Sequence, residues 1–195
     1  KMGELQKVSF GTKVAELVGD ADVKAIAIGT KLYDASAMDL VIEADTQIGN
    51  GVITVYSSKC CMIHETEEVL LAERKQSCGK CTFCREGLIQ LHTMVKEITE
   101  GQGKKEFTDM MEEIGEAMTF STPCTMGQTA SDFAMGSLKY FAGEYEDHIK
   151  KKKCANNVCS AFMSIYIDPD LCEGCEECAD VCPADAIEGK SGYIH

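Results

Sequence analysis

Twelve cysteines stand among 195 residues, and their spacing is the most informative chemical feature of this sequence. Three of them, Cys78, Cys81 and Cys84, recur at intervals of three in the stretch QSCGKCTFCREG. Cysteines at such short spacings, in a chain with no recognisable signal peptide, are typical of metal or redox ligands, whereas disulfide frameworks are typical of small secreted domains. We therefore expect these three thiolates to hold a metal or a metal cluster, which requires a fourth ligand.

Cys124 is the candidate for this fourth ligand. It lies in a break, STPC, between two segments with helical periodicity, and the intervening helical hairpin would return the chain to the first three cysteines. Three closely spaced cysteines plus one remote cysteine are common ligands of 4Fe-4S clusters. Structural zinc more often uses two pairs of ligands. The spacing therefore favours a 4Fe-4S cluster and leaves zinc as the alternative.

The C-terminal tail carries a second run, C-x2-C-x2-C-x3-C-P, which is the pattern of bacterial ferredoxins. Its members are Cys172, Cys175, Cys178 and Cys182. In two-cluster ferredoxins the first three bind one 4Fe-4S cluster and the fourth binds the other. Either the natural chain continues beyond His195, or Cys182 closes a single cluster, or the tail is metal-free here. We expect the first, with one or two clusters in a truncated ferredoxin segment.

Four cysteines remain after these eight are assigned. His148, Cys154 and Cys159 occur together in HIKKKKCANNVC, where a helix end and the following loop could fold around one ion. Cys60 or Cys61 could supply a fourth ligand from the start of the first helix. One imidazole with three thiolates suits a closed structural zinc site. The alternative is a set of buried free thiols beside a surface histidine, since free cysteine is commonly buried.

The elements that must position these residues change type along the chain. Short runs rich in β-branched residues at 23–28, 40–44 and 52–56, with a short helical piece at 13–18, indicate a small α+β unit with a mixed sheet. From residue 65 onward apolar residues recur at intervals of three and four. This period predicts about four helices.

We therefore expect an α+β protein in three parts. Residues 1–60 would form a small domain with a sheet, residues 61–150 a four-helix bundle around the first cysteine group, and residues 151–195 a linker with the ferredoxin-type segment. Because the chain begins with Lys1 and ends abruptly, we expect it to be part of something longer.

Charge and hydropathy exclude several classes of function. A formal net charge of -13 argues against nucleic acid or an anionic membrane surface as the partner, because both reward Lys and Arg. No apolar run is long enough to span a membrane, so we expect a cytoplasmic protein. His64 and His92 have no obvious acid-base partner, and no catalytic residues are predicted.

Three stretches also resemble a known family. SCGKCTFCREG, CTMGQTA at 124–130 and LKYFAGEYEDHI at 138–149 resemble the C-terminal half of the flavin-bearing NADH dehydrogenase subunit of complex I and of NAD-linked bifurcating hydrogenases and formate dehydrogenases. The resemblance implies a soluble-ligand-binding β-grasp (SLBB) domain before a helical bundle. It also implies one 4Fe-4S cluster on Cys78, Cys81, Cys84 and Cys124.

Other positions refine this resemblance. Lys80, Arg85 and Glu86 match the family motif, while Phe83 stands where the family usually has Pro and Gln76 where Glu is common. Cys61, and not Cys60, falls where the hydrogenase-type relatives carry their cysteine, so we choose Cys61 as the zinc ligand. The family's large N-terminal domain is absent from this sequence, and the β-grasp region lacks the family's GGPSGG loop. Flavin and NAD(P) are therefore expected only on missing domains or partner subunits.

These observations predict an iron-sulfur electron-transfer module of a multi-domain NAD(P)-linked oxidoreductase. It would pass single electrons between a flavin site and ferredoxin or another redox subunit, and it would have no substrate site of its own. The expected partners are flavin- and NAD(P)-binding domains, a thioredoxin-like 2Fe-2S subunit and ferredoxin. The alternative is a structural or docking module that its metals only stabilise, and redox activity distinguishes the two because zinc is redox-silent.

Overall fold

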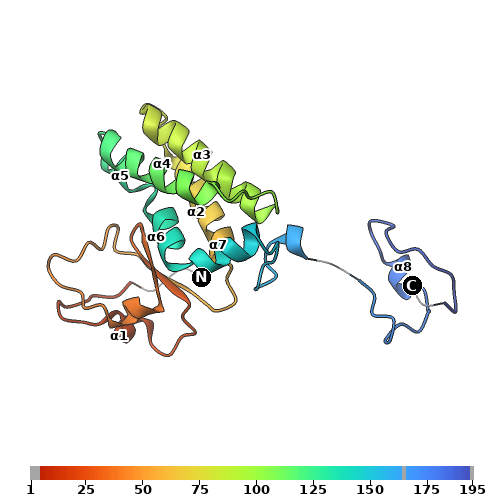
Figure 1. Ribbon diagram of the computed structural model, residues 1–195. Helices are drawn as coiled ribbons and strands as arrows, with labels where there is room; N and C mark the ends of the chain where they lie inside the picture. The colour runs from red at the N-terminus through yellow and green to blue at the C-terminus, as the bar shows by residue number, and fades with distance from the viewer. Residues whose placement is uncertain (1–4, 164–165, 194–195) are drawn as a thin grey trace. The chain divides into compact units, whose positions relative to one another are not determined.

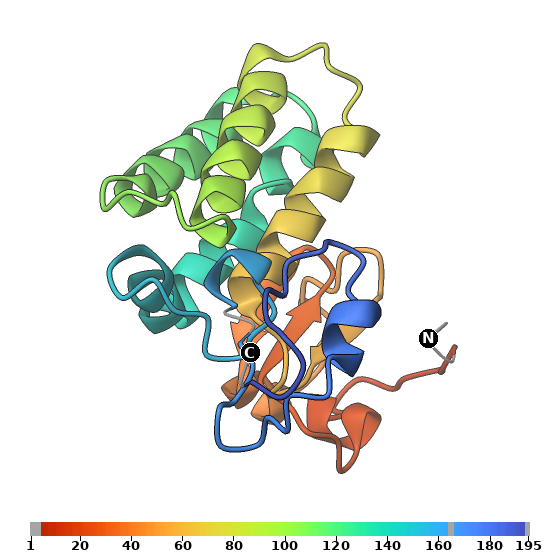
Figure 2. The same cartoon turned by 90° about the vertical axis from the view of Figure 1, so that its right-hand side faces the viewer.

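The computed structural model describes residues 5–163 and 166–193 of the chain. They fall into two compact units, Lys1–Met163 and Ser164–His195, each of which is described by itself (Figure 1). In the first unit a small sheet lies at one end of a group of helices, as both views show (Figures 1 and 2). The expected α+β class is therefore confirmed.

The sheet has three antiparallel strands in the order β2-β1-β3. They are β1 (Ala25–Ile28), β2 (Lys31–Asp34) and β3 (Ile53–Tyr56), preceded by the short helix α1 (Val14–Val18), with the 3-10 turn η1 (Ala35–Asp39) after β2. Gly29 begins the two-residue turn between β1 and β2 with a φ of 61°. A Cβ there would come within 3.0 Å of the Gly49 backbone, so this tight turn requires glycine.

Two expectations about this sheet were wrong. The sheet is antiparallel instead of mixed, and residues 40–44 form no strand: Val41 only makes an isolated bridge with Lys13. The strand that the sequence did not predict is β2, which the tight turn places along one edge of β1. Because β3 occupies the other edge, no edge of β1 remains for residues 40–44.

Helices make up the rest of the first unit. They are α2 (Met62–Gln76), α3 (Thr82–Thr99), α4 (Phe107–Ser121), α5 (Thr125–Thr129), α6 (Asp132–Tyr140) and α7 (Ala142–Ile149), followed by the 3-10 turn η2 (Ser160–Phe162). Their shared core includes the fully buried side chains of Leu70, Leu91, Ile98 and Met111. The helical periodicity continues through residues 133–145, but the structure divides this stretch into α6 and α7 at Phe141, whose ψ of 28° is not helical.

The sheet packs on the helices through α6. The aromatic rings of Tyr56 and Phe133 meet edge to face with centroids 5.8 Å apart. Thr30, in the β1–β2 turn, donates a hydrogen bond of 2.9 Å to the carboxylate of Asp132. Gly136 lets α6 come close to the carbonyl of Leu32. These contacts hold the sheet against α6.

The second unit is built mainly of turns around the short helix α8 (Glu177–Asp180). Gly174 adopts a φ of 68°, and its carbonyl accepts a hydrogen bond of 3.0 Å from the backbone of Gly192. This hydrogen bond closes the stretch 174–192 into a loop. Across the described parts of both units, no helix combines the length and the apolar character needed to span a membrane.

Candidate metal centres

The first candidate centre is a cavity of about 160 Å³ at one end of the helices. Four of its lining residues are the predicted cluster ligands Cys78, Cys81, Cys84 and Cys124. Cys84 is buried and Cys81 half-buried, whereas Cys78 and Cys124 are exposed. The structure therefore brings all four together, with one side of the site open to solvent.

Helix ends place these four cysteines. Helix α2 ends at Gln76, and Gly79 turns the chain with a φ of 70° so that Cys81 becomes the N-cap of α3. Helix α4 then returns the chain and Cys124 caps α5. Gly87 on α3 makes room for the side chain of Met118 on α4, which keeps the two helices close beneath the cavity.

Ser77 is a neighbour of this cavity that the sequence did not single out. Its Oγ lies 3.4 Å from the Sγ of Cys84 and accepts a hydrogen bond of 3.3 Å from the backbone of Gly79. With Cys84 as a thiolate, the hydroxyl must donate its single proton to the sulfur. The guanidinium of Arg85 holds the same loop through the carbonyl of Gly79, at 2.8 Å, and also pairs with Glu86.

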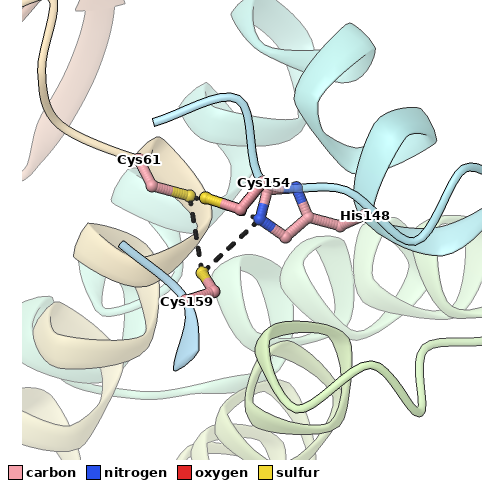
Figure 3. A group of neighbouring side chains, drawn as sticks. All are labelled: Cys61, His148, Cys154 and Cys159. Carbon is pink, nitrogen blue, oxygen red and sulfur yellow. Dashed lines mark hydrogen bonds between the residues drawn. The ribbon is translucent and has the colours of Figure 1, made fainter. Parts of the chain in front are cut away.

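The second candidate centre is the group formed by Cys61, His148, Cys154 and Cys159, called here the Cys3His group (Figure 3). All four side chains are buried, and their ligand atoms lie within 4.8 Å of one another. Cys61 comes from the residue before α2, His148 from the last turn of α7, and the other two from the loop that follows. Within the described ranges this is the one set of three or more such side chains gathered so tightly.

The spacing of these atoms fits tetrahedral zinc. Bonds of about 2.3 Å to sulfur and 2.0–2.1 Å to nitrogen place two sulfurs about 3.8 Å apart and a sulfur and a nitrogen about 3.5 Å apart. The Sγ atoms of Cys61 and Cys159 lie 3.8 Å apart. The Nε2 of His148 lies 3.4 Å from Cys61 and 3.5 Å from Cys159. Three edges of the expected tetrahedron are thus already formed.

The thiols and the imidazole of the Cys3His group shift one another's pKa values, and the pKa of Cys159 is raised, chiefly by its hydrogen bond with Cys61. A hydrogen bond from Cys159 lowers the pKa of Cys61, and His148 lowers it further. Burial alone would lower the pKa of His148, but the hydrogen bond and charge of Cys61 raise it to about 9. The Nδ1 of His148 donates a hydrogen bond of 2.8 Å to the carbonyl of Glu144, which leaves Nε2 facing the thiols. A metal bound here would displace the protons that the group holds.

The ferredoxin-type cysteines lie in the second unit. Cys172 and Cys175 stand in the turns before α8, Cys178 within it and Cys182 just after it. The Sγ of Cys182 accepts a hydrogen bond of 3.5 Å from the backbone of Ala186. This and neighbouring backbone N–H groups lower the pKa of Cys182, which favours the thiolate that an iron ligand requires.

The structure gives contacts for two residues to which the sequence assigned no role, His92 and Cys60. His92 is buried, and its Nδ1 accepts a hydrogen bond of 2.7 Å from the guanidinium of Arg74. Cys60 is half-buried beside Ser57 and does not belong to the Cys3His group. Neither residue contributes to a metal centre in this arrangement.

Two groups of cysteine side chains on an α+β scaffold form candidate metal centres, and comparison with known families indicates the class of protein to which such centres belong. Residues 65–148 match the NADH-ubiquinone oxidoreductase-F iron-sulfur binding region, and residues 165–188 match the 4Fe-4S binding domain. The first match contains all four cysteines of the cavity. The resemblance seen in the sequence is therefore confirmed: residues 65–148 are similar to the iron-sulfur region of this NADH dehydrogenase family, and residues 165–188 are similar to a ferredoxin-type domain.

Individual relatives agree with this assignment. The chain is 34% identical over 148 residues to the NADP-reducing hydrogenase protein HndC of Solidesulfovibrio fructosivorans, covering 76% of this chain and 30% of that protein. It is 30% identical to the F component of the NADH-quinone oxidoreductase of Streptomyces coelicolor, covering 57% and 25%. The chain thus spans less than a third of either relative.

A solved structure shares the fold. The crystal structure of an NAD+-reducing [NiFe]-hydrogenase in the H2-reduced state matches with a TM-score of 0.68 over 72% of this chain and 26% of the matched chain. The sequence identity is 18%, so this likeness concerns the fold alone.

Proposed function

We propose that the chain is an electron-transfer module of an NAD(P)-linked oxidoreductase, in which iron-sulfur clusters carry single electrons between a flavin site and ferredoxin or another redox subunit. The observation that carries this proposal is the cavity lined by Cys78, Cys81, Cys84 and Cys124 inside the matched iron-sulfur region. Its sulfurs do not form a group as tight as the Cys3His group. This wider spread supports a cluster of several irons over a single ion.

The domain organisation follows from the same proposal. Residues 1–60 would be a β-grasp domain of the SLBB type, residues 61–150 a four-helix iron-sulfur bundle, and residues 151–195 a linker with a partial ferredoxin-like fold. Flavin and NAD(P) would belong to other domains or subunits, because this chain spans less than a third of its relatives. A thioredoxin-like 2Fe-2S subunit and ferredoxin are the proposed redox partners, and the cytoplasm is the proposed compartment.

The residues around the cavity would each contribute to cluster binding. When bound, a 4Fe-4S cluster supplies one-electron redox chemistry. Cys81 and Cys84, at the start of α3, would hold it on the enclosed side, and the helix dipole would offset part of the thiolate charge. Cys78 and Cys124 would hold the solvent side, where electrons could leave toward a partner.

For the tail, we propose that Cys172, Cys175 and Cys178 serve one 4Fe-4S cluster and Cys182 a second. The match of residues 165–188 to a 4Fe-4S binding domain and the lowered pKa of Cys182 support cluster ligation, and the C-x2-C-x2-C-x3-C-P spacing supports this division. A complete pair of clusters would need further cysteines from a longer chain.

The Cys3His group is proposed as a structural zinc site. Four protein ligands leave no open coordination position, so such a site would stabilise the fold without chemistry of its own. It joins the start of α2, the end of α7 and the loop that follows, and would fix the beginning of the linker to the helices. This site is the observation that favours the alternative of a structural or docking module.

Replacement of Cys124 by Ser tests the cluster assignment. We expect the electron paramagnetic resonance signal of the reduced cluster in the helical region to disappear or shift markedly, because one iron loses its thiolate. Cys60→Ser is the matched control, since Cys60 is a half-buried free thiol outside both centres. A variant spectrum identical to that of the unaltered protein would refute the ligand set. Absence of any redox-active iron in the unaltered protein would favour the docking module.

The zinc assignment is tested by anomalous diffraction recorded on both sides of the zinc edge. We expect the anomalous signal within bonding distance of His148, Cys61, Cys154 and Cys159 to rise sharply across the zinc edge, and the signal of iron at the Cys78–Cys124 cavity to change little. Iron-edge data from the same crystals are the control, because they should show the reverse. A map without a zinc peak at the Cys3His group would end this assignment and leave the cluster assignment intact.

A further inference from the structure

Lys24 occupies an unusual position between the sheet and the Cys3His group. Its backbone N–H donates a hydrogen bond of 2.8 Å to the carbonyl of Tyr56, which anchors it to the sheet just before β1. Its side chain is only 18% exposed and pairs with the equally shielded carboxylate of Glu144, at 2.7 Å. A pair so shielded is screened less by salt than the exposed ion pairs elsewhere on this unit.

The ammonium of Lys24 reaches the three segments that carry the metal ligands. It donates to the carbonyl of Cys60, at 2.5 Å, which is the residue before Cys61. It contacts Glu144, which lies one helical turn before His148. It also donates, at 3.3 Å, to the side-chain oxygen of Asn156, in the loop between the other two cysteines. All three donor positions of one ammonium are thus used.

Glu144 also contacts the residues next to the metal ligands, through both its side chain and its backbone carbonyl. Its Oε2 accepts a hydrogen bond of 3.0 Å from the backbone N–H of Met62, the residue after Cys61. Its backbone carbonyl accepts the Nδ1 hydrogen bond of His148, at 2.8 Å, which fixes the ring with Nε2 toward the thiols. The backbone on both sides of Cys61 is therefore held by Lys24 and Glu144.

We propose that Lys24 and Glu144 are positioning residues that preorganise the Cys3His group for its metal and couple metal binding to docking of the sheet. This inference rests on the proposed zinc site. Residues that orient metal ligands without binding the metal typically change metal affinity about 10- to 100-fold when they are replaced. Since Lys24 is anchored to β3 through Tyr56, bound metal in turn fixes the sheet against the helices.

The experiment measures zinc and iron together in the cluster-loaded chain. The unaltered protein and its variants are dialysed anaerobically against increasing concentrations of a zinc chelator, and both metals are then quantified. For Lys24→Met we expect the chelator concentration that removes half the zinc to fall about 10- to 100-fold, with iron unchanged. Lys24→Arg, which keeps the charge and several donors, should restore most of the affinity.

A double variant and a control separate positioning from general destabilisation. Lys24→Met leaves the carboxylate of Glu144 shielded and unpaired, so Lys24→Met with Glu144→Gln removes that charge as well. The double variant should still lose zinc early, because the links to Cys60 and Asn156 remain broken. Lys150→Met is the control. It breaks an exposed ion pair with Glu146, which lies on α7 as Glu144 does, and the variant protein should retain zinc normally.

Cobalt substitution supplies a readout that reports ligand geometry directly. Tetrahedral cobalt in the unaltered protein should give intense visible absorption bands, and Lys24→Met should shift or weaken them while Lys150→Met does not. Normal zinc retention and normal cobalt bands in Lys24→Met would overturn the proposal. So would zinc loss accompanied by equal loss of iron and of helical circular dichroism, which would report unfolding. A failure of the unaltered protein to bind zinc would instead refute the zinc site itself.

Discussion

The hydroxyl of Ser77 is the one side-chain donor found beside a predicted cluster ligand in the described structure. Hydrogen bonds to the sulfurs of an iron-sulfur cluster stabilise its reduced, more negative form and so raise the reduction potential. Because Gly79 occupies an acceptor position of Ser77 Oγ, the hydroxyl proton is directed toward the thiolate of Cys84. The hydroxyl group of Ser77 would thus raise the reduction potential of the proposed cluster.

Ser77→Ala should therefore lower the reduction potential of the cluster in the helical region. The expected shift is on the order of tens of millivolts, since a hydrogen bond contributes about 1 kcal/mol and 59 mV corresponds to a tenfold change for one electron. A redox titration followed by electron paramagnetic resonance measures it. Ser57→Ala is the matched control, because Ser57 contacts Cys60, a thiol outside both centres. Equal potentials in the two variants would rule out this contribution.

At the level of residues, spacing predicted the four cavity cysteines and also His148, Cys154 and Cys159, while the family resemblance led to the choice of Cys61. Neither indicated the residues that support these ligands. Cys124 could be placed beside the Cys78–Cys84 turn because a helical hairpin separates them, and periodicity reveals such a hairpin. Ser77, Lys24 and Glu144 gave no comparable signal. Lys24 contacts Asn156 across 132 positions of the sequence, and a single charged residue has no period from which such a contact could be inferred.

Helix α6 is the element that joins the sheet to the helices, and Gly136 is the position where the two come closest. A Cβ at this position would collide with the backbone carbonyl of Leu32 on β2, which cannot move without distorting the sheet. Gly143 on α7 offers a contrast, because a Cβ there meets nothing within 4 Å. The two glycines lie on consecutive helices, and only Gly136 is in close contact with another element.

Gly136→Ala should lower the thermal midpoint of the first unit by roughly 2–10 °C, from an overpacking penalty of about 1–3 kcal/mol. Gly143→Ala should leave the midpoint unchanged or raise it, because alanine favours a helix by about 1 kcal/mol over glycine. Circular dichroism during heating of the cluster-loaded proteins measures both. Equal midpoints for the two variants would show that the close approach of α6 to β2 does not limit stability.

Elements with a long period were predicted better than short ones. The breaks after α3 and α4 carry Gly and Pro and lie where the sequence indicates them. Strand β2 was missed because its four residues, KLYD, are too few and too polar to show alternation, although the Gly29 turn fixes its pairing. Phe141 itself is neither Gly nor Pro, and the nearest following glycine, Gly143, lies inside the first turn of α7, so the local sequence does not mark the end of α6.

At the level of the whole molecule, the sequence predicted the α+β class and the family resemblance, and both are confirmed. Its cysteines group into one set within the helices, one at the junction with the following loop, and one in the second unit. The antiparallel arrangement of the sheet could not be read from the sequence. Strand order depends on which edges are already occupied, and that is a property of the assembled fold.

The separation of ligands along the chain sets an order of assembly during synthesis. Cys61 and Cys159 lie 98 residues apart, so a ribosome adding about 5–20 residues per second makes Cys159 roughly 5–20 s after Cys61. The cavity cysteines end with Cys124, which is made earlier. A nascent chain therefore has all four proposed cluster ligands while the Cys3His group still lacks its histidine and two thiols. The proposed cluster site is thus complete in sequence on the ribosome before the proposed zinc site is.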